Sequence, residues 1–301
     1  MSRTGVRALD RLVTGAGPFG IVACADCRYG ATVPQLSESE LERHYSDQYY
    51  EDFYEHSGQD AEGLLHRLRQ RFRERAAKRR YERRPYRTSA EQPGRVLDVG
   101  CGSGQLLASY ASRGWETYGI DPSAAATAAA ARRGATVHQG TLADQPWAPG
   151  SFDLITFQHT LEHILDPLDA LARAARLLAP GGLLIVDVPN WDCWQRRLFG
   201  NRWFHLDLPR HQQHFSPRAL RKASDRLGLQ VRGAGTTSTA ISSSYSLHYL
   251  IAGHWTPGWK LWLSYGLGIL ALPAVLLVDR VIGGDCCFIA MGRGPTPHKR
   301  E

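Results

Sequence analysis

A strand that turns into a helix across three closely spaced glycines constrains this chain more than any other feature. Residues 95–104 read Arg-Val-Leu-Asp-Val-Gly-Cys-Gly-Ser-Gly, and they predict a buried strand followed by a helix over 105–113. Glycines at such a turn let backbone N–H groups approach a ligand, because no Cβ stands in the way. A dinucleotide fingerprint needs a further glycine where Gln105 stands. The acid Asp98 at the strand end suits a ligand that carries an amine or a positive charge better than a pyrophosphate.

Strands and helices continue to alternate after this loop. We expect strands over 116–121, 136–140, 152–159, 183–188 and 286–291, and a helix over 168–178 that ends at Pro180-Gly181-Gly182. Such alternation is typical of a parallel sheet that is covered by helices on both faces.

The run 96–104 resembles the first motif of class I S-adenosylmethionine-dependent methyltransferases, and the order of elements after it is similar to theirs. The resemblance implies an α/β fold with a Rossmann-like seven-stranded sheet and an antiparallel last strand. The residues of this chain add to it an N-terminal helical arm and a hydrophobic helical insertion before the last strand. The resemblance also implies S-adenosylmethionine as the methyl donor and S-adenosylhomocysteine as the product.

Asp121 ends the second predicted strand, where a carboxylate can accept hydrogen bonds from ribose hydroxyls. The predicted cofactor-binding residues are Asp98, Gly100, Cys101, Gly102, Gly104, Asp121, Pro122, Thr141, Leu142 and Gln158. The chain departs from its relatives at Thr141, since they place there an acid that holds the adenine amino group. Asp144 stands three residues later, and we expect the adenine contacts to differ.

Histidines gather in the segments that follow the fourth and fifth predicted strands, where this fold binds the acceptor. The segment 207–216 resembles one that recurs in bacterial methyltransferases of glycan and natural-product pathways. Histidine suits a general base because its ordinary pKa lies near neutrality. The predicted catalytic residues are His211, His214 and His159, and the predicted substrate-binding residues are His163, Asp207 and Arg210. The alternative is that these histidines only brace a helix over 217–227, which Ser216 would cap.

We divide the chain into an N-terminal arm, residues 1–92, and a methyltransferase domain, residues 93–301, with a hydrophobic insertion over 241–280. The pair Cys24 and Cys27 resembles half of a four-cysteine zinc module, but residues 1–23 contain no cysteine or histidine. Four ligands are usual for structural zinc, so we predict no metal. The six cysteines do not form a disulfide pattern, which favours a reducing compartment.

Positive charge is concentrated in the arm. The chain carries a net charge of +7, and residues 66–87 hold eleven Lys or Arg residues against two acids. Apolar residues at three- and four-residue steps predict an amphipathic helix there. Two interpretations of this helix stay open. In one it is a solvated helix that covers the cofactor site, and in the other it binds an anionic membrane surface. Nucleic acid is the least favoured partner, because no RNA-binding module accompanies the segment.

The insertion is long and apolar. Residues 261–278 carry no formal charge, and 242–252 forms a second apolar segment. A single membrane crossing would put the last strand on the wrong side, so we predict monotopic attachment or an apolar substrate channel. The alternative is a helical cover over the protein's own core or over a second copy in a homodimer. A cytoplasmic protein, peripheral on the inner face of the membrane, fits this pattern.

These observations predict a methyltransferase that O-methylates a sugar, a glycan or a small-molecule natural product, which is expected to be lipid-linked. Two alternatives stay open. One is a quinone-like or other aromatic acceptor, and the other is a membrane-associated protein that binds the cofactor without catalysis.

Overall fold

The computed structural model describes residues 2–8, 10, 17–45, 93–238, 242–254 and 259–293. The chain divides into two compact units, one of residues 1–44 with 147–301 and the other of residues 45–146. The basic segment 66–87 lies outside the described residues. The boundary expected at residue 93 stays a prediction.

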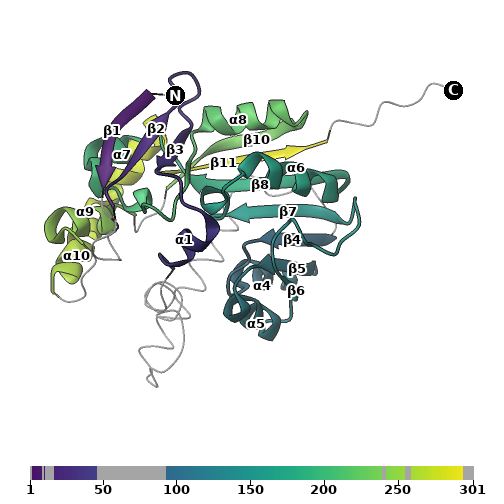
Figure 1. Ribbon diagram of the computed structural model, residues 1–301. Helices are drawn as coiled ribbons and strands as arrows, with labels where there is room; N and C mark the ends of the chain where they lie inside the picture. Colours follow the sequence, from purple (N-terminus) through teal and green to yellow (C-terminus); the bar gives the residue numbers. More distant parts are fainter. Residues whose placement is uncertain are drawn as a thin grey trace, which may run out of the picture. The chain divides into compact units, whose positions relative to one another are not determined.

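The main sheet contains seven strands in the order β10-β11-β8-β7-β4-β5-β6 (Figure 1). This confirms the predicted fold class, with a mixed sheet whose last strand is antiparallel. The unit of residues 45–146 contributes β4 (Arg95–Val99), α4 (Gln105–Ala111), β5 (Glu116–Asp121), α5 (Ala124–Arg132) and β6 (Thr136–Gln139). Within it β4 pairs with β5, and β5 with β6, in parallel. The predicted strands and helix match these bounds within two residues.

The other unit contributes four strands and the helices around them. These are β7 (Phe152–Gln158), α6 (Pro167–Leu177), β8 (Leu178–Pro189), α7 (Trp194–Phe199), α8 (Pro217–Arg226), β10 (Gln230–Thr237) and β11 (Cys286–Gly292). The strand β8 runs parallel to β7 and antiparallel to β11. As predicted, Ser216 caps α8, because its hydroxyl accepts the N–H of Ala219.

The sequence did not predict β10, whose residues show no apolar alternation. Two of its eight residues are glycines, and glycine weakens a strand unless close packing requires it. At Gly235 packing does require it, because a Cβ there would lie 2.9 Å from the ring of Phe288. The strand therefore forms through its pairing with β11 rather than through its own residues.

The described part of the N-terminal arm is mainly β-structure, although a helical arm was expected. Three strands form it, β1 (Ser2–Ala8), β2 (Phe19–Ala23) and β3 (Gly30–Val33), followed by the short helix α1 (Glu38–Glu42). The strand β9 (Gln213–His214) extends this sheet to four strands in the order β1-β2-β3-β9. Phe19 and Ile21 of β2 pack in one buried cluster with Trp203, Leu206 and Leu208. The arm therefore contacts the histidine-rich segment in two ways, through the pairing of β3 with β9 and through a shared hydrophobic cluster.

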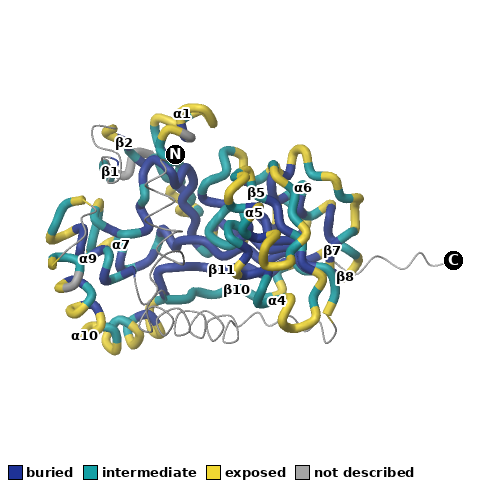
Figure 2. Tube along the Cα trace, turned by 90° about the horizontal axis from the view of Figure 1, so that it is seen from below, coloured by how far each residue is buried: buried dark blue, intermediate teal, exposed yellow. Residues whose placement is uncertain are grey.

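The hydrophobic insertion is a helical hairpin of α9 (Ser242–Ala252) and α10 (Trp259–Ile282). It leaves the sheet after Thr237 and returns at Cys286, and these two residues are paired across β10 and β11. Both ends of the hairpin are therefore held at one edge of one sheet. Figure 2 shows that much of α10 is exposed, and it presents Leu270, which is 79% exposed, and Val281, which is 78% exposed.

Candidate functional site

The glycine loop between β4 and α4 has backbone angles that residues with a side chain rarely adopt. Gly100, Gly102 and Gly104 have φ angles of 72°, 50° and 75°, in the left-handed region that favours glycine. Gly104 is restricted further, because a Cβ there would lie 2.8 Å from the Cβ of Ala130 in α5. Both requirements explain why the loop contains glycines at these positions.

Two predicted cofactor ligands border this loop. Asp98, at 3% exposure, is buried at the end of β4. The carboxylate of Asp121 accepts hydrogen bonds from the N–H of Gly102 at 3.0 Å and of Ser123 at 2.9 Å. Burial raises the pKa of Asp121, and these two N–H donors oppose that rise. Each carboxylate oxygen can accept a further bond, so the strand-end acid fits the ribose of S-adenosylmethionine.

Cys101 contributes to the loop through packing. Its side chain is buried against β5, since a Cβ at Gly119 would lie 2.7 Å from the Cys101 sulfur. Its N–H donates to the carbonyl of Ile120 at 3.2 Å. Burial raises the pKa of the thiol, so it stays protonated and does not act as a nucleophile.

The segment after β6 has a carboxylate beside Thr141, the position at which an acid was expected from the relatives. Asp144 Oδ1 accepts hydrogen bonds from the N–H of Thr141 at 2.7 Å and from its hydroxyl at 3.1 Å. The same carboxylate lies against Gly140, whose φ is 151°. Asp144 therefore folds back onto Thr141, although three residues separate them. Of the remaining predicted ligands, Leu142 is buried, Pro122 follows β5, and Gln158 ends β7 in the other unit.

A buried acid and a partly exposed histidine follow β7 in the other unit. His159 adopts φ of 50°, and backbone strain of this kind is found mainly at functional positions. Its Nδ1 lies 3.4 Å from Oε1 of Glu162, and the two side chains are 31% and 1% exposed. Burial disfavours the Glu162 carboxylate, but the hydrogen bond from His159 and the charge of His163 lower its pKa to about 2. The acid is therefore ionised at neutral pH.

His163 and His211 approach each other beside this acid. Their rings are 4.7 Å apart between centroids, in an edge-to-face arrangement. His163 Nδ1 is 3.1 Å from the carbonyl of Arg210, and His211 Nδ1 is 2.8 Å from the carbonyl of His205. Burial lowers the pKa of His211 to about 4, so this ring is neutral at pH 7.

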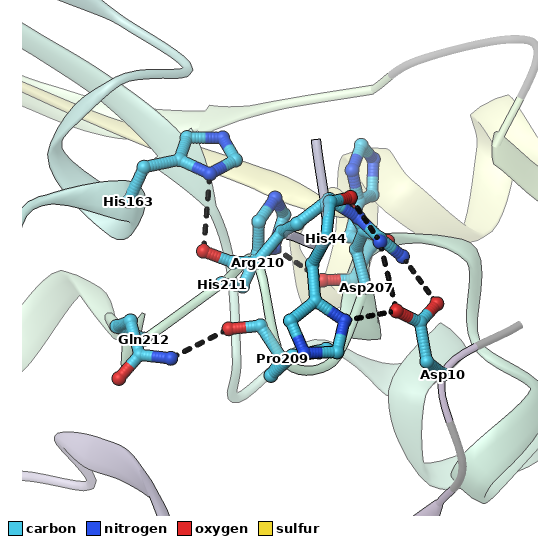
Figure 3. A network of polar contacts seen from close by, with 9 residues as sticks. Asp10, His44, His163, Asp207, Pro209, Arg210, His211 and Gln212 are labelled. Carbon is cyan, nitrogen blue, oxygen red and sulfur yellow. Dashed lines mark hydrogen bonds and ion pairs between the residues drawn. The ribbon is translucent and has the colours of Figure 1, made fainter. Parts of the chain in front are cut away.

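Arg210 was predicted to bind an acidic group on the substrate, but the structure buries it completely. Its guanidinium forms two hydrogen bonds with Asp10, at 2.8 and 3.0 Å, and further bonds with Asp207 and the carbonyl of His44 (Figure 3). His44 Nδ1 in turn donates to Asp10 at 2.7 Å. Arg210 thus joins the arm to the histidine segment, and Asp207 holds the same guanidinium from within that segment, which differs from the substrate contact expected of them.

His214, one of the two preferred bases, occupies a structural position. It is 4% exposed, belongs to β9 and lies against the ring of Trp191. The hydroxyl of Thr32 donates to the His211 carbonyl at 2.6 Å, so His214 Nε2 donates to that hydroxyl at 3.0 Å. Burial lowers its pKa to about 3. Among the three predicted bases, His159 is the most exposed.

Glu162 and Asp10 belong to this cluster without having been predicted as site residues. Glu162 stands in the motif Thr-Leu-Glu-His, and its acid next to a histidine was the available signal. Asp10 had no signal, because its partner Arg210 lies 200 positions later in the chain.

Comparison with known proteins identifies the family of this chain. A family model described as a methyltransferase domain matches residues 68–233, more than half of the chain. The ubiquinone biosynthesis O-methyltransferase of Rhodopseudomonas palustris strain TIE-1 is 32% identical over 181 residues, which cover 56% of this chain and 72% of that protein. A protein with the same name from Alkalilimnicola ehrlichii is 33% identical over 171 residues, which cover 51% and 68%.

Solved structures show the same fold. Magnesium protoporphyrin IX methyltransferase from Synechocystis PCC 6803, determined with bound S-adenosylhomocysteine, has a TM-score of 0.54 at 14% identity and covers 86% of this chain and 100% of its own. The chain therefore belongs to the class I S-adenosylmethionine-dependent methyltransferase family. It is an enzyme that uses S-adenosylmethionine, as the glycine loop and the acids at 98 and 121 predicted.

Proposed function

We propose that this enzyme methylates a hydroxyl oxygen of an aromatic, quinone-type acceptor, and that His159 is the general base. The names of the relatives from Rhodopseudomonas palustris and Alkalilimnicola ehrlichii support the acceptor class. They favour the aromatic alternative over the glycan acceptor that the sequence placed first. The single observation that supports the base is the contact between His159, which is partly exposed, and the buried acid Glu162.

The chemistry needs alignment and one proton transfer. S-adenosylmethionine, when bound, supplies a methyl group that its sulfonium already activates. The acceptor oxygen forms its bond to the methyl carbon as the carbon–sulfur bond breaks, and the hydroxyl proton passes to the His159 imidazole. Glu162 orients that imidazole and stabilises its protonated form, and a base in this role contributes a factor of about 10²–10⁴.

Donor binding and turnover test the proposal separately. We expect S-adenosylmethionine to bind wild-type protein in calorimetry and Asp121→Ala to lose that binding. His159→Ala should bind the donor normally and lose about 10²–10⁴-fold in kcat on a catechol acceptor. His214→Gln is the matched control, with kcat close to wild type. Full turnover in His159→Ala would refute the assignment of His159 as the base. Turnover on a lipid-linked sugar but on no catechol would refute the proposed acceptor class.

We also propose that the hairpin of α9 and α10 lies on a membrane surface. Among the described residues one helix, Trp259–Ile282, is long and apolar enough to cross a membrane by length and composition. Only 18% of its most apolar window is buried. Because β10 and β11 hold both ends of the hairpin at one edge of the sheet, it enters and leaves the membrane on the same side. Such a surface would supply an acceptor that carries an apolar chain. The expected homodimer stays a prediction.

A further inference from the structure

Two half-buried cysteines lie three residues apart in the turn between β2 and β3. Cys24 directly follows β2, and neither it nor Cys27 is part of a disulfide. The N–H of Arg28 donates to the carbonyl of Cys24 at 3.0 Å, and the N–H of Cys24 donates to the carbonyl of Tyr29 at 2.8 Å. The first bond joins residues four apart, so the chain makes one turn of the helical type here. Residues three apart in such a turn lie on the same side of it.

The spacing of the two cysteines suits a disulfide. Cα atoms three residues apart in a helical turn are separated by about 5 Å, and disulfides join Cα atoms about 4.4–6.8 Å apart. The thiol of Cys27 is already hydrogen-bonded to the sulfur of Cys24. A bond between the two sulfurs therefore requires rotation of the side chains rather than movement of the backbone.

The surroundings of Cys24 favour its thiolate, which is the form that attacks a disulfide. The N–H groups of Cys27 and Asp26 donate to the Cys24 sulfur and lower the pKa of its thiol, and the Cys27 thiol lowers that pKa further. The charge of Asp26 acts in the opposite direction, but Arg218 and Lys222 both pair with that carboxylate. Cys24 is therefore the attacking thiol, and Cys27 is placed to attack it in turn.

The other four of the six cysteines lie in the interior, and they are Cys101, Cys193, Cys286 and Cys287. Burial raises the pKa of the thiols of Cys101, Cys193 and Cys287. Buried thiols in apolar surroundings are inert toward oxidants and disulfides. Oxidation is therefore directed to the turn between β2 and β3.

This turn is attached to α8 at two points. The hydroxyl of Ser216, which caps α8, donates to the carbonyl of Cys27 at 2.7 Å. Asp26, between the two cysteines, pairs with two basic side chains of the same helix. A bond between Cys24 and Cys27 would fix the conformation in which the turn makes these contacts.

We propose that Cys24 and Cys27 form a reversible disulfide by exchange with a low-molecular-weight disulfide of the glutathione type, and that this bond holds the turn against α8. The Cys24 thiolate attacks one sulfur of the oxidant, whose S–S bond breaks and releases one thiolate. The Cys27 thiol gives up its proton to solvent and attacks the Cys24 sulfur, which releases the second thiolate. Two protein thiols and one small disulfide thus become one protein disulfide and two small thiols. Transient bonds of this kind are compatible with the reducing compartment expected for this chain.

Mass spectrometry of the full-length protein tests the exchange without reading turnover. Reduced, chelator-treated protein is equilibrated with mixtures of oxidised and reduced glutathione, and the remaining thiols are alkylated. Trypsin releases both cysteines in one peptide, residues 12–28. We expect this peptide to lose two hydrogens and to retain no glutathione as the share of oxidised glutathione rises, and dithiothreitol should reverse the change.

Two single variants locate the chemistry. Cys27→Ser should stop at the mixed disulfide, with one glutathione on Cys24, because the second attack is missing. Cys193→Ser, at a buried cysteine, is the matched control and should react as the wild type does. Titration of S-adenosylmethionine into each sample shows that the variant is folded, and the wild-type peptide decides the question if Cys27→Ser fails that check.

Thermal unfolding shows whether the bond holds the turn. Oxidised wild type should unfold about 2–5 °C above the reduced protein, because the closed ring restricts the unfolded chain. Cys24→Ser/Cys27→Ser should unfold at one temperature in both conditions.

The proposal is overturned if the peptide stays reduced at every glutathione ratio, or if wild type retains glutathione instead of forming the disulfide. It is also overturned if oxidation fails to raise the midpoint of unfolding. Zinc that purified protein holds and that Cys24→Ser/Cys27→Ser loses would overturn it as well, since the thiols would then serve a metal. None of these outcomes affects the choice of acceptor or of His159.

Discussion

The guanidinium of Arg210 pairs with both carboxylate oxygens of Asp10, 200 positions earlier in the chain. Both side chains are fully buried, and Asp207 provides a second carboxylate on the same guanidinium. The bond joins the first residues of the arm to the segment that carries His211 and His214. The arm is therefore part of the support of the histidine cluster rather than a separate appendage.

Removing one partner of this buried pair should be costly. We expect Asp10→Asn to lower the free energy of unfolding by about 3–5 kcal/mol, since it leaves Arg210 without a full counter-charge. Urea denaturation followed by circular dichroism measures it. Asp26→Asn is the control, because Asp26 pairs with Arg218 and Lys222 at the surface, and no measurable loss is expected there. Equal stability of both variants would contradict the structural role of the pair.

Stability should fall on acidification because of the buried histidines. Burial, followed by the charge of His211, lowers the pKa of His214 from 6.5 to about 3. Between those values the unfolded chain binds a proton that the folded chain does not, so the free energy of unfolding falls with falling pH. The expected slope is about 1.4 kcal/mol per pH unit for this one group. Thermal unfolding from pH 7 to pH 4 should show a shallower slope in His214→Gln, and an unchanged slope would refute the assignment.

Two glycines with similar backbone angles should respond differently to alanine. Gly104 and Gly134 have φ of 75° and 89°, but a Cβ at Gly104 would collide with Ala130, whereas one at Gly134 meets nothing within 4 Å. Gly134→Ala should cost only the strain of a left-handed residue, about 1 kcal/mol. Gly104→Ala should additionally displace α5 from the loop and weaken S-adenosylmethionine binding at least tenfold in calorimetry. Equal donor affinity in the two variants would argue against close packing at the loop.

The contact between α9 and α10 should depend on Gly268. A Cβ there would lie 2.8 Å from the Cβ of Ser244 and 3.1 Å from its Cα, while Gly266 has open space. Gly266→Ala should stabilise α10 by up to about 1 kcal/mol through helix propensity. Gly268→Ala should instead push the helices apart and lower the midpoint of thermal unfolding. If both variants melt alike, the two helices are not packed at this point.

The exposed face of α10 should determine vesicle binding. We expect full-length protein to float with liposomes that contain anionic lipid, and Leu270→Glu/Val281→Glu to reduce the floated fraction several-fold, because charges are costly in an apolar phase. Leu198→Glu serves as the control, since Leu198 is 66% exposed on α7, outside the hairpin. Wild-type protein that stays in solution with such liposomes at low salt would overturn the attachment.

The elements predicted correctly are those whose own residues carry the signal. The glycine turn and the strands that carry Asp98 and Asp121 were predictable because a left-handed turn and an apolar strand are local requirements, and the cap at Ser216 is local too. The pairing of β3 with the two-residue strand β9 was not, because neither segment implies the other. Glu162 shows the same limit at the site, because its burial beside His159 exists only in the folded chain.

The hairpin of α9 and α10 returns to the sheet at a tightly closed junction. Asn190 donates its N–H to the carbonyl of Asp285 and its side-chain amide to that of Gly284, and a Cβ at Gly284 would lie 2.2 Å from the carbonyl of Thr237. The apolar hairpin is therefore a self-contained insertion, and backbone contacts at its base close it off from the sheet. Because its two ends are fixed to each other, such an insertion can change in length or sequence to suit a different acceptor, while the sequence of the glycine loop stays the same.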